Sequence, residues 1–150
     1  MDEKVNLTWE EIHESTKELA SIINSKFKPD IVIAIGEGGW IPARLLKNYI
    51  KCPYYSIRCK NYDEEDNQLP EATITQDIEI SKIKGEKVLI LDEVADSGIT
   101  MEKVHKHLLE LNPEEIRTAV LHKKEKSIFN PDYIHKNMGN TWIVYPWDKK

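Results

Sequence analysis

The sequence has no apolar run that approaches the roughly 18 residues needed to cross a membrane. Its first residues, Met1–Lys4, lack the apolar segment of a secretory signal peptide. Cysteine is scarce as well, because only Cys52 and Cys59 are present and they do not form a Cys-x-x-Cys pair. These absences predict a cytoplasmic protein with two free thiols, since reducing conditions disfavour disulfides.

Basic charge is also limited. The chain has 21 Lys and Arg residues against 26 Asp and Glu residues, which gives a net charge of −5 at pH 7. Without a cluster of basic residues, this balance argues against a nucleic-acid-binding surface. The five histidines show no zinc-like spacing, so we expect them at the surface. A length of 150 residues, 40% of them apolar, suits one globular domain with a real core.

Alternating helix and strand patterns predict an α/β fold with a parallel sheet. Thr8 to Glu11 have the form of a capping box, and apolar residues then recur at helical spacing as far as Phe27. The next segment, 31–35, is entirely apolar, which indicates a strand buried on both faces. Further strands are expected at 54–59, 73–80, 88–91 and 116–121, with a helix between the last two that ends at Asn112-Pro113.

The stretch Val88–Met101 carries the clearest functional pattern. Four apolar residues are followed by the acids Asp92 and Glu93, and then by the small polar turn 96–100 at the start of a helix. Free backbone N–H groups and the helix dipole favour a phosphate at such a turn. Adjacent acids would repel phosphate unless they hold a ribose diol or Mg²⁺, so the pattern indicates an activated ribose phosphate. The alternative is that Asp92 or Asp96 only caps the following helix.

Residues 92–100, Asp-Glu-Val-Ala-Asp-Ser-Gly-Ile-Thr, resemble the phosphoribosyl-pyrophosphate signature of type I phosphoribosyltransferases. In that family two acids and two further residues precede an Asp-Thr/Ser-Gly-x-Thr turn. The resemblance implies a single α/β domain over 1–150, with a parallel sheet flanked by helices and a small C-terminal hood at about 123–148. It also implies Mg²⁺ as the cofactor.

The loop Gly36-Glu37-Gly38-Gly39 is rich in glycine. Its glycines indicate that the backbone approaches a ligand closely, that it adopts unusual dihedral angles, or that it forms an ordinary tight turn between a strand and a helix. It resembles the pyrophosphate loop of the same enzymes, commonly Arg/Lys-Gly-Gly, in which the peptide before the first paired glycine is often cis. Glu37 stands where a basic residue is frequent. Because a carboxylate would repel pyrophosphate, we expect the amides of Gly38 and Gly39 to bind it and the Glu37 side chain to point elsewhere.

Residues 57–62, Ile-Arg-Cys-Lys-Asn-Tyr, are similar to the Ile-Arg-x-Lys-Ser-Tyr run of hypoxanthine-guanine phosphoribosyltransferases. Asn61 replaces the usual serine. The resemblance implies that Arg58 and Lys60 serve the pyrophosphate end of the substrate. Without the resemblance, both are equally well explained as solvated charges at the end of a strand.

The segment after this run is strongly acidic. Residues 63–68 carry four acids, and Leu69-Pro70 interrupts regular structure, so the segment is expected to be mobile. A lid that closes over the site would exclude water from a cationic transition state. We therefore expect a flexible lid at about 61–73, with the strand 73–80 at its base.

The C-terminal tail resembles the base-binding hood of 6-oxopurine phosphoribosyltransferases, and the xanthine-guanine enzymes of bacteria most closely. It combines Lys123, a Pro-Asp-Tyr turn and a final Trp-Ile-x-x-Pro-Trp-Asp run. The resemblance implies that Lys123 donates to the purine O6 and that Trp142 stacks on the ring. It also implies that the backbones of Ile143 and Asp148 read the 2-position. A tryptophan stripe is otherwise typical of core packing.

The reaction implied by the resemblance is transfer of 5-phosphoribose from phosphoribosyl pyrophosphate to hypoxanthine, guanine or xanthine, with release of pyrophosphate. Asp96 would act as general acid or base at the purine N7. Asp92 and Glu93 would hold the ribose hydroxyls and, together with Asp148, place Mg²⁺. The residues implied at the 5′-phosphate are Ala95, Asp96, Ser97, Gly98, Ile99 and Thr100, and those implied at the pyrophosphate are Glu37, Gly38, Gly39, Arg58 and Lys60.

Other functions remain open at this point. The same fold serves enzymes that act on adenine or on a pyrimidine, and it serves regulatory proteins that bind nucleotides without turnover. A nucleotide-binding methyltransferase would leave the second pair of acids unexplained. The resemblance further implies a homodimer or homotetramer, with phosphoribosyl pyrophosphate and a purine base as partners and with neither nucleic acid nor membrane.

Overall fold

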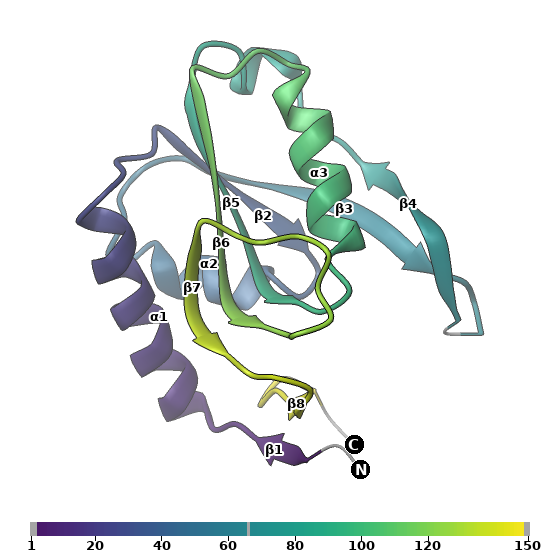
Figure 1. Cartoon of the computed structure of the whole chain (residues 1–150). Coiled ribbons are helices and arrows are strands. Elements are labelled where there is room, and N and C mark those ends of the chain that lie inside the picture. The colour runs from purple at the N-terminus through teal and green to yellow at the C-terminus, as the bar shows by residue number, and fades with distance from the viewer. Residues whose placement is uncertain (1–2, 66, 149–150) are drawn as a thin grey trace.

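The computed structural model describes residues 3–65 and 67–148. Its main sheet has six strands in the order β4-β3-β2-β5-β6-β7, and all neighbours pair in parallel except β3 and β4 (Figure 1). A short parallel pair, β1-β8, forms a second sheet. The strands are β1 (Lys4–Asn6), β2 (Ile31–Gly36), β3 (Tyr54–Tyr62), β4 (Gln68–Gln76), β5 (Lys87–Ala95), β6 (Glu115–Lys123), β7 (Tyr133–Asn137) and β8 (Trp142–Val144). The helices are α1 (Trp9–Asn24), α2 (Trp40–Leu46), α3 (Ile99–Leu109) and the short 3₁₀ helix η1 (Ile80–Lys82).

The two faces of the main sheet bury separate apolar clusters. Leu89 and Leu91 of β5 belong to the cluster that includes α1 and α2, whereas Val88 and Ile90 belong to the cluster that includes α3. Side chains alternate between the two faces of a strand, so an unbroken apolar run becomes buried on both sides. The α/β fold with a largely parallel sheet is therefore confirmed, and β5 is its central strand.

Helix α1 begins as the sequence predicts. The Thr8 hydroxyl accepts a hydrogen bond from the Glu11 amide at 3.1 Å, and the Thr8 amide donates to the Glu11 carboxylate at 3.2 Å. These bonds satisfy first-turn amides that have no partner within the helix. The helix ends at Asn24, and Phe27 packs into the core from the turn that follows. Across the described residues, no helix has both the length and the apolar character needed to cross a bilayer.

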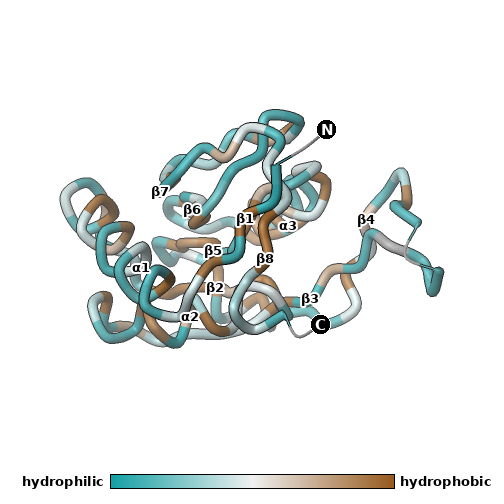
Figure 2. Tube along the Cα trace, turned by 90° about the horizontal axis from the view of Figure 1, so that it is seen from below, coloured by the Kyte–Doolittle hydropathy of each residue, from teal (hydrophilic) through white to brown (hydrophobic). Residues whose placement is uncertain are grey.

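Strands β3 and β4 form a hairpin that extends away from the rest of the molecule, with a hydrophilic tip (Figures 1 and 2). β4 spans residues 68–76, so the prediction of a strand at 73–80 was wrong at both ends. Backbone pairing explains the difference, because Lys60 lies opposite Thr73 and Tyr62 lies opposite Gln68. Most of the segment predicted as a flexible lid is consequently strand, and the described residues between the strands are 63–65 and 67.

The hood differs from the prediction in its composition. β7 lies within the predicted range 123–148, but it pairs with β6 as the edge strand of the main sheet. β8 pairs instead with β1, so residues near the N-terminus complete the hood. The Leu7 amide extends this pairing with a 2.9 Å hydrogen bond to the Val144 carbonyl. Sequence patterns did not indicate this pairing, because β1 and β8 are only three residues long.

The parallel pairing brings the carboxyl ends of five strands to one edge of the main sheet. Gly36 at the end of β2 lies opposite Arg58 of β3, and Ala95 at the end of β5 lies opposite Lys123 of β6. In open α/β sheets, ligands bind outside the carboxyl ends of the strands. The residues that the sequence analysis singled out come together at this edge.

The capping box gives the first testable prediction. Thr8→Ala removes the side-chain acceptor at the start of α1, so we expect the free energy of unfolding to fall by about 1 kcal/mol. Urea denaturation at unchanged m-value measures this loss. Thr8→Ser keeps the acceptor and is the matched control, with an expected change of less than about 0.5 kcal/mol. Identical midpoints for wild-type and Thr8→Ala proteins would show that the capping box contributes nothing to stability.

Candidate functional site

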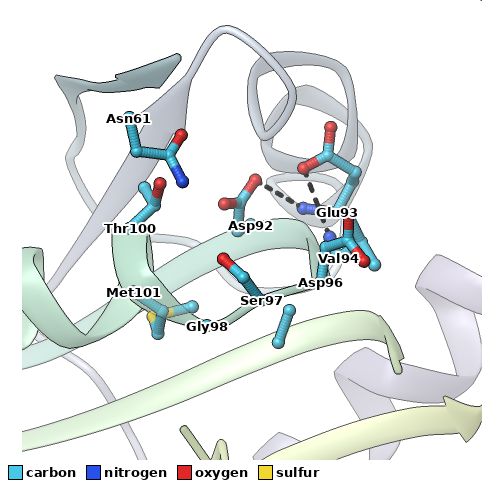
Figure 3. A pocket seen from close by; sticks show the side chains of 10 residues that line it. Asn61, Asp92, Glu93, Val94, Asp96, Ser97, Gly98, Thr100 and Met101 are labelled. Carbon is cyan, nitrogen blue, oxygen red and sulfur yellow. Dashed lines mark hydrogen bonds between the residues drawn. The ribbon is translucent and has the colours of Figure 1, made fainter. Parts of the chain in front are cut away.

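The turn after β5 surrounds a cavity of about 170 Å³, which we call the phosphate-turn cavity. Figure 3 shows the side chains of Asn61, Asp92, Ser97 and Thr100 directed toward the same space. They come from β3, from β5, from the turn after β5 and from the first turn of α3. Of the residues expected at the 5′-phosphate, all line this cavity except Ile99, whose amide donates to the Ser97 hydroxyl at 3.3 Å.

Gly98 is required at this turn for two reasons. Its φ of 85° is a left-handed conformation that favours glycine. A Cβ there would also lie 2.6 Å from the Ser127 hydroxyl and 2.7 Å from the Phe129 amide. The Ile128 amide donates to the Ser97 carbonyl at 2.8 Å. The loop 124–129 therefore packs directly against the turn, a contact that the sequence analysis missed because no pattern links the two segments.

Asp92 and Glu93 line the phosphate-turn cavity as two adjacent carboxyl groups. Asp92 is only 7% exposed, and its carboxylate accepts a 2.8 Å hydrogen bond from the Glu93 amide. Burial raises the pKa of the Asp92 carboxyl well above its ordinary value, and the negative charge of Glu93 raises it further. A cation or a pair of hydroxyl donors would relieve the cost of holding these two charges together.

The glycine loop after β2 packs against the end of β5. A Cβ on Gly38 would collide with the carboxylate of Glu93, and one on Gly39 would lie 2.7 Å from the Ile35 carbonyl oxygen. The Gly39 amide, expected at the pyrophosphate, donates instead to this Ile35 carbonyl at 2.8 Å. Packing within the protein thus accounts for both glycines.

The cis peptide of this loop joins Gly36 to Glu37, one bond earlier than the resemblance implies. The Glu37 carboxylate lies 3.5 Å from the Arg58 guanidinium. Both line a second cavity of about 540 Å³ together with Lys60 and Asn61. The Glu37 side chain therefore lies beside Arg58, the cation expected at the pyrophosphate, and offsets part of its charge.

Asn61 connects the two cavities. It is 7% exposed and lines both the phosphate-turn cavity and the cavity that contains Arg58 and Lys60. Asn61 stands where a serine is usual, and no role was predicted for it from the sequence. Its place on β3, separated from β5 only by β2, brings it to the same cavity as the end of β5, which was not visible without the strand order.

A third cavity of about 160 Å³, the hood cavity, lies between the end of β5 and the hood. Trp142 and Ile143, both expected at the base, line it together with Tyr145, which the sequence analysis missed. Trp142 is 63% exposed, so it is not part of the core. Its ring is available to stack on a planar ligand. Val94 and Asp96 line this cavity and the phosphate-turn cavity as well.

The lysine that lines the hood cavity is Lys124, whereas Lys123 was expected there. The ammonium of Lys124 lies 3.8 Å from the Asp96 carboxylate, and its side chain is 12% exposed. The Lys123 ammonium donates to the Lys124 carbonyl at 3.4 Å. Neighbouring residues of an extended segment point to opposite sides, so a shift of one position changes which lysine faces the cavity.

Aromatic side chains of the hood and of α1 support the hood cavity, and Tyr145 among them is buried. The Tyr145 ring stacks on Trp147 at a centroid distance of 4.7 Å, and Trp147 contacts Trp9 of α1 at 6.0 Å. The Tyr145 hydroxyl lies 2.8 Å from His122 Nδ1. Burial lowers the pKa of His122 to about 4, so this histidine is neutral at pH 7. His122 is 3% exposed, and the prediction that all histidines lie at the surface was wrong.

The three acids expected at the metal do not form one group. Asp148 is exposed, and its carboxylate accepts a hydrogen bond from the Tyr145 amide at 3.3 Å. Within residues 3–65 and 67–148, no three His, Cys, Asp or Glu side chains lie close enough together to hold a metal ion. Asp92 and Glu93 remain as a pair, and Asp148 does not join them.

Comparison with known proteins agrees with this geometry. Residues 8–149 match the family model described as a phosphoribosyl transferase domain. The xanthine-guanine phosphoribosyltransferase of Gluconobacter oxydans is 29% identical over 144 residues, which cover 95% of this chain and 83% of the relative. The hypoxanthine-guanine phosphoribosyltransferase of Schizosaccharomyces pombe is 30% identical over 179 residues, which cover 94% and 87%.

Two solved structures are also similar. A purine phosphoribosyltransferase from Pyrococcus horikoshii superposes with a TM-score of 0.85 at 32% identity, covering 98% of this chain and 95% of that one. A protein of Neisseria gonorrhoeae with bound ppGpp has a TM-score of 0.85 at 35% identity, covering 99% and 91%. With a family match over nearly its whole length, this chain belongs to the phosphoribosyl transferase domain family.

Proposed function

We propose that this protein is a purine phosphoribosyltransferase of nucleotide salvage, which transfers 5-phosphoribose from phosphoribosyl pyrophosphate to a 6-oxopurine and releases pyrophosphate. The observation that supports this most is the shared wall of Val94 and Asp96 between the phosphate-turn cavity and the hood cavity. A nucleoside monophosphate has the same order of parts, with ribose between a phosphate and a planar base.

The phosphate-turn cavity suits the 5′-phosphate. Its hydroxyls, Ser97 and Thr100, donate to phosphate oxygens, and the start of α3 adds the positive end of a helix dipole. Asp92 and Glu93 suit the ribose, because carboxylates accept hydrogen bonds from vicinal hydroxyls. Arg58 and Lys60 supply positive charge in the adjoining cavity, where we place the pyrophosphate.

Asp96 is the residue we assign to proton transfer at the purine N7. It lines the hood cavity beside Trp142 and Lys124, so a base stacked on Trp142 lies within the same small space. A carboxylate in that position accepts the N7 proton as the new bond to C1′ forms. The N–H groups at the turn and Arg58 stabilise the negative charge on the phosphate groups during the reaction.

The acids Asp92 and Glu93 fit Mg²⁺. Carboxylate oxygens are the ligands this ion prefers, and one or two carboxylates plus substrate phosphates are its usual protein environment. Burial and the negative charge of Glu93 both raise the pKa of the Asp92 carboxyl, so a cation beside the pair would stabilise its charged form. Bound Mg²⁺ would neutralise charge on the leaving pyrophosphate. We propose Mg²⁺ as the cofactor, held by Asp92 and Glu93 without Asp148.

The hood cavity suits a 6-oxopurine. The Lys124 ammonium carries three donors and no acceptor, so it matches the carbonyl O6 and leaves the exocyclic amine of adenine unpaired. Trp142 supplies a stacking surface. The named relatives act on xanthine, guanine or hypoxanthine, and the ligand ppGpp of the Neisseria gonorrhoeae protein contains guanine. These names support a 6-oxopurine as the base.

The proposal also covers the location of the reaction and the oligomeric state of the protein. Phosphoribosyl pyrophosphate carries several negative charges and does not cross membranes unaided, so we place the reaction in the cytoplasm where this substrate is available. We also propose a homodimer or homotetramer. The exposed aromatic residues Trp40, Tyr49 and Tyr55, each between 37% and 42% exposed, support a contact between copies.

The role of Asp96 predicts a specific loss of rate. Asp96→Asn keeps the shape of the turn and removes the proton acceptor, so we expect kcat to fall about 10²- to 10⁴-fold. Single-turnover measurements with saturating phosphoribosyl pyrophosphate isolate the chemical step. Glu125→Gln changes an exposed acid of the adjacent loop and should leave the rate unchanged. A normal single-turnover rate in Asp96→Asn would show that Asp96 is not the proton acceptor.

The metal assignment predicts which acids control the response to Mg²⁺. EDTA should abolish turnover and added Mg²⁺ should restore it. Glu93→Gln should raise the Mg²⁺ concentration needed for half-maximal rate by about tenfold or more, because one of two carboxylate ligands is lost. Asp148→Asn is the control and should leave that concentration unchanged. Full turnover in EDTA, or an equal shift in both variants, would contradict the assignment.

The choice of base predicts different effects for two adjacent lysines. Wild-type protein should strongly prefer guanine or hypoxanthine over adenine in kcat/KM, because the Lys124 ammonium can donate to a carbonyl O6 but not to the exocyclic amine of adenine. Lys124→Met should reduce this preference about 10- to 100-fold. Lys123→Met, the control, should retain it. The opposite result would assign O6 recognition to Lys123, and a wild-type preference for adenine would refute the hood assignment.

A further inference from the structure

The phosphate-turn cavity has an imbalance of charge. Three carboxylates line it, those of Asp92, Glu93 and Asp96, and among the described residues no lysine, arginine or histidine lines it. A phosphate dianion that enters this cavity meets only uncharged donors, which are backbone amides, hydroxyls and the Asn61 carboxamide. Amides and a helix dipole favour an anion, but three nearby carboxylates oppose it. A cation close to the cavity would offset that repulsion.

Two ammonium groups lie next to this cavity, and both contact the same carboxylate oxygen. Lys126 lies 3.3 Å and Lys124 lies 3.8 Å from Asp96 Oδ1. This oxygen is buried, and it accepts no hydrogen bond from the described residues. The ion pairs are therefore the main interactions of Asp96 Oδ1 in the ligand-free protein.

The two lysines differ in their freedom to move. Lys124 is 12% exposed and lines the hood cavity, so its position is set by packing around the base. Lys126 is 59% exposed and can reorient with little cost. Solvent screens an exposed ion pair with a monovalent carboxylate, so the contact between Lys126 and Asp96 is weak.

The loop that carries Lys126 is held firmly against the phosphate turn. The Lys124 amide donates to the Ala95 carbonyl at 3.0 Å, and the Ile128 amide donates to the Ser97 carbonyl at 2.8 Å. Gly98 permits this approach, because any side chain there would collide with Ser127. The backbone near Lys126 is thus fixed at the mouth of the cavity, while its side chain is free to reach either Asp96 or a bound anion.

From these contacts we propose that Lys126 is a 5′-phosphate-binding residue. In the ligand-free protein its ammonium pairs with Asp96, and in the bound protein it moves to the phosphate oxygens. Charge-assisted bonds to a dianionic phosphate are stronger than a screened pair with one carboxylate, which favours this exchange. The move also leaves Asp96 to the base and to Lys124. The proposal rests on the proposed function for the identity of the ligand.

Ribose 5-phosphate is the direct probe, because it fills the cavity without a leaving group or a base. Isothermal titration should show binding about tenfold weaker for Lys126→Met than for wild type, the size of one partly exposed charge-assisted bond. Lys126→Arg should restore most of the affinity. Lys106→Met removes an equal charge from an exposed pair with Glu102 on α3, and it should change the affinity by less than about twofold.

A double-mutant cycle separates direct contact with phosphate from an effect through Asp96. If Lys126 binds phosphate itself, Lys126→Met should weaken ribose 5-phosphate binding about as much in an Asp96→Asn background as in wild type. If the effect vanishes in that background, Lys126 acts only by neutralising Asp96 and the proposal is wrong. Equal affinities for wild type and Lys126→Met would also overturn it.

Failure of the role proposed for Lys126 and failure of the proposed enzymatic function give different experimental results. A protein that binds ribose 5-phosphate through Lys126 but transfers phosphoribose to no base would refute the enzyme assignment and leave the phosphate site intact. A protein that turns over normally, with binding of ribose 5-phosphate insensitive to Lys126→Met, would refute only the role of Lys126. The KM for the base should be unchanged in Lys126→Met in either case, and a change confined to that KM would place Lys126 at the base instead.

Discussion

The carboxylate of Glu93 fills the space that a side chain on Gly38 would need, so the end of β5 and the loop after β2 share one contact. Parallel pairing of β2 and β5 creates this contact, since it brings both carboxyl ends to one edge of the sheet. The positions of the acids, the glycine loop and the Arg58 cavity depend on it. A residue with a Cβ at Gly38 would displace the acid, and with it the proposed ribose and metal site.

The glycine loop shows how one residue pattern can have two physical causes. The sequence indicated either close approach to a ligand or a tight turn, and the resemblance favoured a ligand. In the structure Gly39 approaches the Ile35 carbonyl and Gly38 approaches Glu93, so contacts within the protein already require both glycines. A ligand can still approach the loop, but the glycines alone do not demonstrate one. Only the three-dimensional contacts separate these causes.

Contiguous features were predictable from the sequence, and features that join distant segments were not. The β5 run, its acids and the turn 96–100 lie in one stretch, so periodicity and residue chemistry predicted a strand and a turn there, although β5 continues through both acids to Ala95. Lys124 was missed because the side of the chain it faces depends on the register of β6 with β5. The pair of His122 with Tyr145 joins residues 23 positions apart, and no local pattern connects them. The β1-β8 sheet was missed for the same reason.

The three carboxylates of the phosphate-turn cavity weaken the binding of an anionic substrate, but they favour catalysis. Asp92, Glu93 and Asp96 oppose the binding of an anionic substrate, so in the ground state they are unfavourable. As the bond from C1′ to pyrophosphate breaks, the ribose gains positive charge, and the same carboxylates then stabilise it. An interaction that is stronger in the transition state than in the ground state accelerates the reaction. The cation of Arg58, in the adjoining cavity where we propose that the pyrophosphate binds, would offset this repulsion and leave the carboxylates free for the chemical step.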